Sequence, residues 1–285
     1  MLDFFKNLDR RWIFLAMLVS VVIPLLVQKT FPEIPAKLVQ NVFDAVEELP
    51  EGSKVLLAMD YDPASEGELG PMATAFVRHL CEKKLKIYFI ALWPLGVQMT
   101  EDIINDEIKA RYPDMVYGED YVNLGYKSGA EGVIKVIVTD LKKLYTTDQY
   151  GTGINDIPLT KNIKSIQDMD FILNVSAGYP GTKEWVQYAV TPYPKLRMAG
   201  GCTGVQAPLL YPYIPNQLLG LLGAIKGAAE YEAALVLKYP KYKDPKYNEG
   251  LRRMAPQLWA HVLILLLIIL GNIIYFAEKK REARR

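Results

Sequence analysis

The chain has 285 residues, of which 51% are hydrophobic and 23% are charged, and its formal net charge at pH 7 is +1. This balance argues against a nucleic-acid partner, because binding to phosphates needs a strongly basic surface. The two cysteines, Cys81 and Cys202, are too few for a disulfide framework. We expect two buried free thiols, and a single disulfide is the alternative.

Two apolar segments lie near the ends of the chain, at residues 12–27 and 258–277. A stretch of about 18 apolar residues is long enough to cross the hydrocarbon core of a membrane. We therefore expect transmembrane helices at residues 12–28 and 257–277. The first is interpreted as an uncleaved signal-anchor, since no small-residue cleavage motif follows it. Membrane lipid is thus an expected partner.

Basic residues flank the outer end of each apolar segment. Residues 1–11 contain Lys6, Arg10 and Arg11, and residues 278–285 form a basic tail. Because the cytoplasmic flanks of membrane helices are enriched in Lys and Arg, we expect both termini in the cytoplasm. Residues 29–256 then form one extracytoplasmic domain, whose length permits translocation whatever its own charge. The predicted location is the cell membrane, with two spans.

Between these anchors, apolar runs alternate with segments of helical spacing. Strands are expected at residues 54–60, 85–92, 121–126, 170–175 and 196–199. Helices are expected at residues 36–49, 65–84, 100–111, 130–145, 182–190 and 216–238. This alternation is typical of a doubly wound, mostly parallel α/β sheet, either flavodoxin-like or Rossmann-like in strand order.

An acidic loop follows the first expected strand. In open α/β sheets, ligands bind beyond the carboxyl ends of the strands. Asp60, Asp62 and Glu66 lie there and offer the oxygen ligands that Mg²⁺ or Ca²⁺ prefers. The alternative is structural: Asp62 starts a turn before Pro63, and Glu66 complements a helix N-terminus. The first interpretation implies a divalent cation, whereas the second implies no cofactor.

Two glycine-containing loops are expected at the same edge of the sheet. One contains Ser176 and Gly178 and leads into a helix, and the other contains Gly200, Gly201 and Thr203. Glycine permits a ligand to approach the backbone closely, and a helix N-terminus can hold an anion. With the two aspartates of the acidic loop, these residues form the candidate ligand-binding set. Neither loop has the spacing of a dinucleotide fingerprint or a P-loop.

A nucleophilic mechanism would need a base close to its nucleophile. The chain has only two histidines. His79 falls in the middle of an expected helix, and His261 falls inside the second apolar segment. Neither is expected to reach Ser176 or Cys202. No catalytic residue is therefore assigned, and the histidines and cysteines do not have zinc-ligand spacing.

Small residues recur in the last expected helix of the domain. Gly220, Gly223 and Gly227 follow one another at helical spacing. Because glycine permits two backbones to approach closely, we expect either packing of this helix on its own sheet or contact with another subunit. In the second apolar segment, Asn272 is placed to hydrogen-bond to a neighbouring helix. These four residues form the candidate interface.

These features favour a membrane-anchored, non-catalytic α/β protein that acts as a structural or accessory subunit of a membrane protein assembly. The assembly would be a homo-oligomer or a complex with other membrane protein subunits. The alternative is an extracytoplasmic domain that binds a ligand or performs divalent-cation-dependent hydrolysis through the acidic loop. The two anchors, the glycine-faced helix and the missing base weigh toward the first function.

Overall fold

The computed structural model describes residues 9–28 and 30–283, which belong to two compact units. The larger unit, Glu33–Gly250, is an α/β domain. The smaller unit combines the two ends of the chain, up to Pro32 and from Leu251 onward. The domain carries the candidate site, and the smaller unit carries the two apolar helices.

A single sheet of six parallel strands forms the centre of the α/β domain, in the order β3-β2-β1-β4-β5-β6. This is the strand order of a Rossmann-type sheet and differs from the flavodoxin-type order. The predicted doubly wound architecture is thus found, with every strand parallel. The strands are β1 (Lys54–Asp60), β2 (Lys86–Ala91), β3 (Tyr121–Tyr126), β4 (Phe171–Ser176), β5 (Met198–Cys202) and β6 (Leu221–Gly223).

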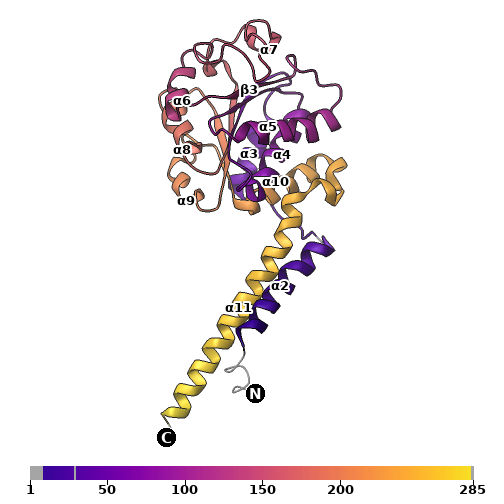
Figure 1. Ribbon diagram of the computed structural model, residues 1–285, viewed down its shortest axis with the longest axis vertical. Coiled ribbons are helices and arrows are strands. Elements are labelled where there is room, and N and C mark those ends of the chain that lie inside the picture. Colours follow the sequence, from indigo (N-terminus) through magenta and orange to yellow (C-terminus); the bar gives the residue numbers. More distant parts are fainter. Residues whose placement is uncertain (1–8, 29, 284–285) are drawn as a thin grey trace. The chain divides into compact units, whose positions relative to one another are not determined.

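Helices cover both faces of this sheet, as Figure 1 shows for α4 and α5 on one side and α6 and α8 on the other. In the first half of the domain they are α3 (Lys37–Glu47), α4 (Glu66–Glu82), α5 (Gly96–Ile103) with its π-helical continuation η1 (Ile104–Lys109), and α6 (Glu131–Ile137). In the second half they are α7 (Pro158–Lys161), η2 (Ile166–Asp168), α8 (Thr182–Trp185) with its π-helical continuation η3 (Val186–Val190), α9 (Ala207–Leu210), η4 (Tyr211–Tyr213), α10 (Ala224–Lys238), η5 (Pro240–Lys243) and η6 (Pro245–Tyr247).

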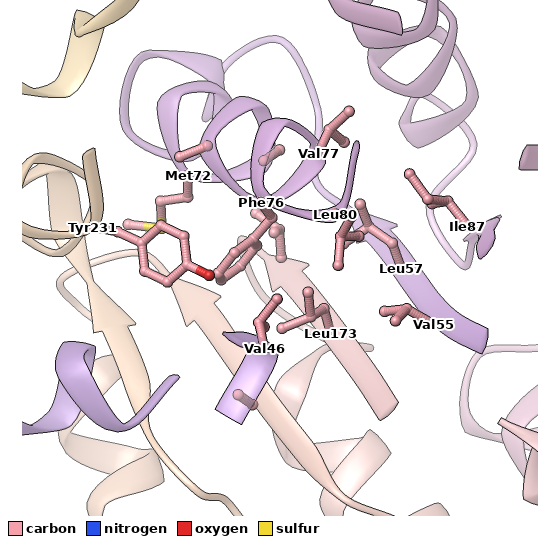
Figure 2. Packing of buried hydrophobic residues seen from close by; sticks show 14 of the residues in the cluster. Val46, Val55, Leu57, Met72, Phe76, Val77, Leu80, Ile87, Leu173 and Tyr231 are labelled. Carbon is pink, nitrogen blue, oxygen red and sulfur yellow. The ribbon is translucent and has the colours of Figure 1, made fainter. Parts of the chain in front are cut away.

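The two faces of the sheet support two separate hydrophobic cores. Side chains of a strand point alternately to opposite faces, so Leu57 of β1 enters one core while Leu56 enters the other. The first core is completed by α3, α4, α5 and α10. Figure 2 shows its packing, in which the ring of Tyr231 meets Phe76 edge-on with centroids 5.0 Å apart. The second core is completed by helices on the other face, including α6 and η3.

Several predicted boundaries were wrong because local signals compete with packing. The helix expected from Thr100 begins at Gly96, and the Thr100 hydroxyl donates to the Gly96 carbonyl inside α5. The helix expected at 130–145 ends at Ile137. The short helix α7 lies in the segment 146–164, where no helix was predicted.

Two glycines predicted in a loop are part of strand β5. Gly200 and Gly201 pair with Asn174 and Val175 of β4 and are buried. A Cβ atom on Gly200 would lie 3.0 Å from the Thr182 side chain, so a larger residue there would require Thr182 to shift. The prediction that these two positions lie in a loop was wrong. Their contact with a ligand stays a prediction.

The long helix predicted at 216–238 was also wrong in its first part. Helix α10 begins at Ala224, and the preceding residues form the short strand β6. Gly220 lies before β6, and a Cβ atom there would overlap the carbonyl of Leu38 in α3. Gly227 faces Leu222, whose Cα would be 2.7 Å from an added Cβ. At these two positions glycine permits close packing within the domain, which is the first of the two predicted alternatives. Contact with another subunit stays a prediction.

The smaller unit contains α2 (Arg10–Val27) and the helix α11 (Glu249–Glu282), which extends into it from the domain. Both helices are long and apolar enough to span a membrane. At about 1.5 Å per residue, the 18 residues of α2 cover roughly 27 Å. The amide of Asn272 donates to the Ile268 carbonyl one turn earlier, at 2.9 Å, and so has a partner within α11.

We predict that Gly220→Ala lowers the free energy of unfolding by about 1–3 kcal/mol, because the new methyl group must displace α3. Gly132 in α6 is the matched control, since nothing lies within 4 Å of an added Cβ. Gly132→Ala should leave stability unchanged or raise it by up to about 1 kcal/mol. Denaturant unfolding of the full chain in mild detergent measures both. A Gly220→Ala protein of unchanged stability but altered oligomeric size would restore the subunit-contact interpretation.

Candidate functional site

The carboxyl edge of the sheet has its switch point between β1 and β4, the two central strands. Connections from these strands run in opposite directions along the sheet, which opens the crevice where such folds bind ligands. Strand pairing places Asp60 of β1 beside Ser176 of β4, and Ser176 beside Cys202 of β5. The predicted residues Asp60 and Ser176 are therefore brought together.

Asp60 is fully buried and accepts three hydrogen bonds. One carboxylate oxygen accepts from the backbone N–H of Leu92 at 2.7 Å. The other accepts from the Asn174 amide at 2.7 Å and from the indole N–H of Trp185 at 2.9 Å. The donors come from the end of β2, from β4 and from α8. Asp60 thus ties together three segments that are far apart in the sequence.

A chain of buried hydrogen bonds extends from Asp60 to Ser176. The hydroxyl of Thr182 donates to the Asn174 side-chain oxygen at 2.6 Å and lies 2.9 Å from the Ser176 hydroxyl. The Ser176 oxygen also accepts from the Thr182 backbone N–H at 3.0 Å. Each of these side chains is buried. We call Asp60, Asn174, Thr182, Ser176 and Trp185 the switch-point network.

Sequence reasoning identified two members of this network and missed the other three. One signal was available for Asn174, because it is the only strongly polar residue inside a strand that is otherwise apolar. Such a residue must be hydrogen-bonded when buried. Trp185 gave no comparable signal, since a buried tryptophan is ordinary in a core.

Burial raises the pKa of Asp60 to about 7, even though the hydrogen bonds from Leu92, Trp185 and Asn174 each lower it. A charged carboxylate in an apolar interior loses its hydration. The free-energy cost of this loss exceeds the stabilisation that the three hydrogen bonds give to the charged form. Asp60 therefore changes its charge near neutral pH while remaining inaccessible to solvent.

The other predicted cation ligands do not join Asp60. Asp62 accepts from the Ser65 backbone N–H at 3.2 Å, as expected of a turn. Glu66 lies in the first turn of α4, as predicted for a residue that complements the helix dipole. Within residues 9–28 and 30–283, no group of three or more His, Cys, Asp or Glu side chains is placed to hold a metal ion. The geometry gives the predicted Mg²⁺ or Ca²⁺ site no support.

The two remaining loop residues lie at the edge but contribute to turns and packing. Gly178 lies against Trp93, whose ring would be 3.1 Å from an added Cβ. The indole N–H of Trp93 donates to the Pro180 carbonyl at 2.8 Å and holds this loop. The carbonyl of Thr203 accepts from Gln206 at 3.0 Å in a turn.

His79 is buried at the far end of α4 and uses both ring nitrogens. One lies 2.7 Å from the hydroxyl of Tyr231 in α10, and the other lies 3.0 Å from a carboxylate oxygen of Glu47 in α3. Burial lowers the pKa of His79, while the Glu47 carboxylate opposes this change. Its partners belong to the helical layer and not to the strand-end loops, as expected from its sequence position.

Both cysteines are free and buried. Burial raises the pKa of Cys202 to about 12 and that of Cys81 still higher. A thiol needs to ionise before it becomes a good nucleophile, so these positions disfavour thiol chemistry.

A cavity of about 580 Å³ begins at Tyr61, directly after β1, and runs between α4 and the α5–η1 helix. It was not predicted from the sequence, because its walls come from segments more than 180 residues apart, from Tyr61 to Glu249. Its α4 wall includes Glu66 in the first turn. In Rossmann folds, this turn is where a dinucleotide pyrophosphate binds. Here carboxylates occupy that position and disfavour an anion.

Comparison of the chain with family models, with curated proteins and with solved structures finds no match. Strand order alone describes a fold that supports many unrelated functions. The function therefore has to be inferred from the residues at the sheet edge, in the cavity and on the surface.

We predict that Asp60 makes the protein less stable as pH rises from about 4 to 7. A carboxyl group whose pKa is higher in the folded state contributes stability below its unfolded pKa of 3.8, and this contribution disappears as pH rises through about 7. Between pH 5 and 8 the loss is roughly 2–3 kcal/mol, at 1.36 kcal/mol per unit. His79 acts with the opposite sign, because its lowered pKa favours the folded state at higher pH.

The measurement compares the full chain with Asp60→Asn by denaturant unfolding at pH 5 and pH 8. The difference between the two proteins cancels the His79 contribution. We expect wild type to be more stable than Asp60→Asn by a margin that shrinks at pH 8. Asp62→Asn, in the neighbouring turn, is the control and should keep the wild-type pH profile. A constant margin at both pH values would show that Asp60 does not titrate in this range.

Proposed function

We propose that the protein is a membrane-anchored, non-catalytic α/β subunit of a membrane protein assembly. In this proposal, α2 and α11 span the cell membrane in contact with lipid, both termini are cytoplasmic, and the α/β domain is extracytoplasmic. Support for the anchors comes from two helices of sufficient length and apolar character. Support for the orientation comes from the basic residues at their outer ends, among them Arg10, Arg11, Lys279 and Lys280.

The non-catalytic role is supported by how the reactive side chains are used. Ser176 and Asp60 are buried in the switch-point network. His79 bonds to Glu47 and Tyr231. Cys202 is buried with a raised pKa. These four side chains are therefore buried or bonded within the domain, which disfavours their attack on a substrate.

One observation favours an assembly in particular: an exposed apolar segment follows β5 at the carboxyl edge. Val205 is 87% exposed, Leu209 is 63% exposed and Tyr211 is 51% exposed, and all three lie in or beside α9 and η4. Single exposed apolar residues are normal, but several in one short segment indicate a contact with another protein. We infer that this segment contacts a second copy of the chain or another subunit.

A second function, ligand binding, is favoured by the cavity between α4 and the α5–η1 helix. Its volume lies in the range of small-molecule sites, roughly 300–1,000 Å³. Divalent-cation-dependent hydrolysis at the acidic loop has no comparable observation in its favour and stays a prediction from the sequence.

For the assembly, we predict that Leu209→Asp reduces the size of the native complex. A charged side chain at an apolar contact must be desolvated without a partner, which weakens association. Native gel electrophoresis of membranes solubilised in mild detergent should show the wild-type chain above the monomer position and Leu209→Asp nearer to it. Val116→Asp is the matched control, since Val116 is also exposed but lies outside this segment. Wild type at the monomer position would contradict the proposal.

For the orientation, we predict that a cysteine introduced at Asn155 is labelled by an impermeant maleimide in intact cells. Asn155 is exposed on the domain surface. A cysteine at Ala283, beyond the second apolar segment, should react only after the cells are opened. The two native cysteines are buried, so background labelling should be low. The reverse labelling pattern would place the domain in the cytoplasm.

A further inference from the structure

The cavity between α4 and the α5–η1 helix carries an excess of negative charge. Six acidic and three basic side chains line it. Each basic side chain already has an anionic partner: Arg78 and Arg111 contact Glu107 at 2.5 and 2.9 Å, and Lys246 contacts Asp244 at 3.0 Å. The positive charges of the lining are therefore used within the protein.

Three carboxylates of the lining have no such partner. In the part of the chain that the structure describes, Glu66, Asp102 and Asp106 form no side-chain hydrogen bond or ion pair. The Glu66 carboxylate folds back over Gly70, where an added Cβ atom would lie 2.7 Å from Oε1. Asp102 and Asp106 are four residues apart and so share a helix face. The uncompensated charge thus lies on both walls of the cavity.

Tyr61 adds a buried polar group to the same cavity. Its side chain is only 1% exposed and lines the space between the walls. Over the described ranges, its hydroxyl has no hydrogen-bond partner. Tyr61, Glu66 and Asp102 line the same cavity. Burial raises the pKa of Tyr61, and the two carboxylates raise it further. The hydroxyl oxygen is accessible from the cavity, so a group that enters the cavity can form a hydrogen bond with it.

The rest of the lining limits the kind of ligand. Pro71, Met99 and Ile103 supply apolar surface beside the carboxylates. A single divalent ion needs several oxygen ligands around one point, and the described residues provide no such group. An anion is disfavoured by the charge of the walls. The lining therefore suits a molecule that combines positive charge with an apolar chain.

We propose that this cavity binds a small organic amine, an alkyl chain that carries one or more ammonium groups. The ammonium groups pair with the unpartnered carboxylates, and the oxygen of Tyr61 accepts one N–H hydrogen bond. The alkyl chain contacts Met99 and Ile103. This assignment is independent of the subunit role, because the cavity and the apolar segment after β5 involve different residues.

The test is calorimetric titration of the full chain in mild detergent with cadaverine, a five-carbon diamine. We expect saturable binding by wild type. Tyr61→Phe removes only the hydroxyl and keeps the ring in the core, so the protein should fold. Its dissociation constant should be at least about tenfold higher, because a hydrogen bond to a charged group contributes roughly 1.5–3 kcal/mol. Asp102→Asn should also weaken binding.

Asp114→Asn is the charge-matched control, since Asp114 is exposed and lies outside this cavity. It should bind cadaverine as wild type does. Glutarate, a dianion of the same carbon length, should not bind. Three results would each overturn the proposal: no saturable binding at millimolar cadaverine, an unchanged dissociation constant in Tyr61→Phe, or equal weakening in Asp114→Asn. Displacement of cadaverine by Mg²⁺ at the same molar concentration would also contradict the proposal, because it would show that the cavity attracts any divalent cation.

Discussion

A carboxylate that is removed from water must be hydrogen-bonded. At the carboxyl edge of this sheet, three segments meet at Asp60 because each supplies a donor to its carboxylate. Its three donors come from the end of β2, from β4 and from α8. Removing any one would leave a buried charge incompletely paired. Asp60 therefore reinforces the position of β1, which strand pairing with β2 and β4 also holds, and it links β1 to α8. Asp60 is buried where it bonds to these three segments, and this burial also raises its pKa to about 7.

This arrangement changes where a ligand has access to polar groups. In a Rossmann-type sheet the switch-point crevice is the usual binding position. Here the hydroxyls of Ser176 and Thr182 bond to each other, and the Thr182 hydroxyl also donates to Asn174. The accessible polar groups lie instead beside the crevice, in the cavity between α4 and the α5–η1 helix. The polar groups at the edge of the sheet are thus used within the protein, whereas three carboxylates that line the cavity have no partner among the described residues.

The sequence predicted the strands well because buried parallel strands are continuous apolar runs. β1 and β3 begin and end at the predicted residues. The errors in the strands came from glycine in β5 and from the short length of β6. Gly200 was placed in a loop, although it lies in β5 and packs closely against the side chain of Thr182. Strand β6 has three residues, which are too few to show the periodicity of a strand. Its apolar residues also fit the spacing of a helix, so they were predicted to belong to the helix that follows.

The switch-point residues could be placed at one edge from the sequence, but their partners could not. Leu92 donates through its backbone and leaves no trace in residue type. The cavity was beyond sequence reasoning for the same reason, since its walls are assembled by tertiary packing. The sequence nevertheless indicated negative charge near the cavity. Glu66 and Glu68 lie in the first turn of α4, at the position where a Rossmann fold would hold phosphate. These carboxylates counter the helix dipole from within the chain. The sheet therefore has the topology of a dinucleotide-binding fold, but the negative charge in the first turn of α4 disfavours a phosphate. The fold and the class of ligand have to be inferred from different residues.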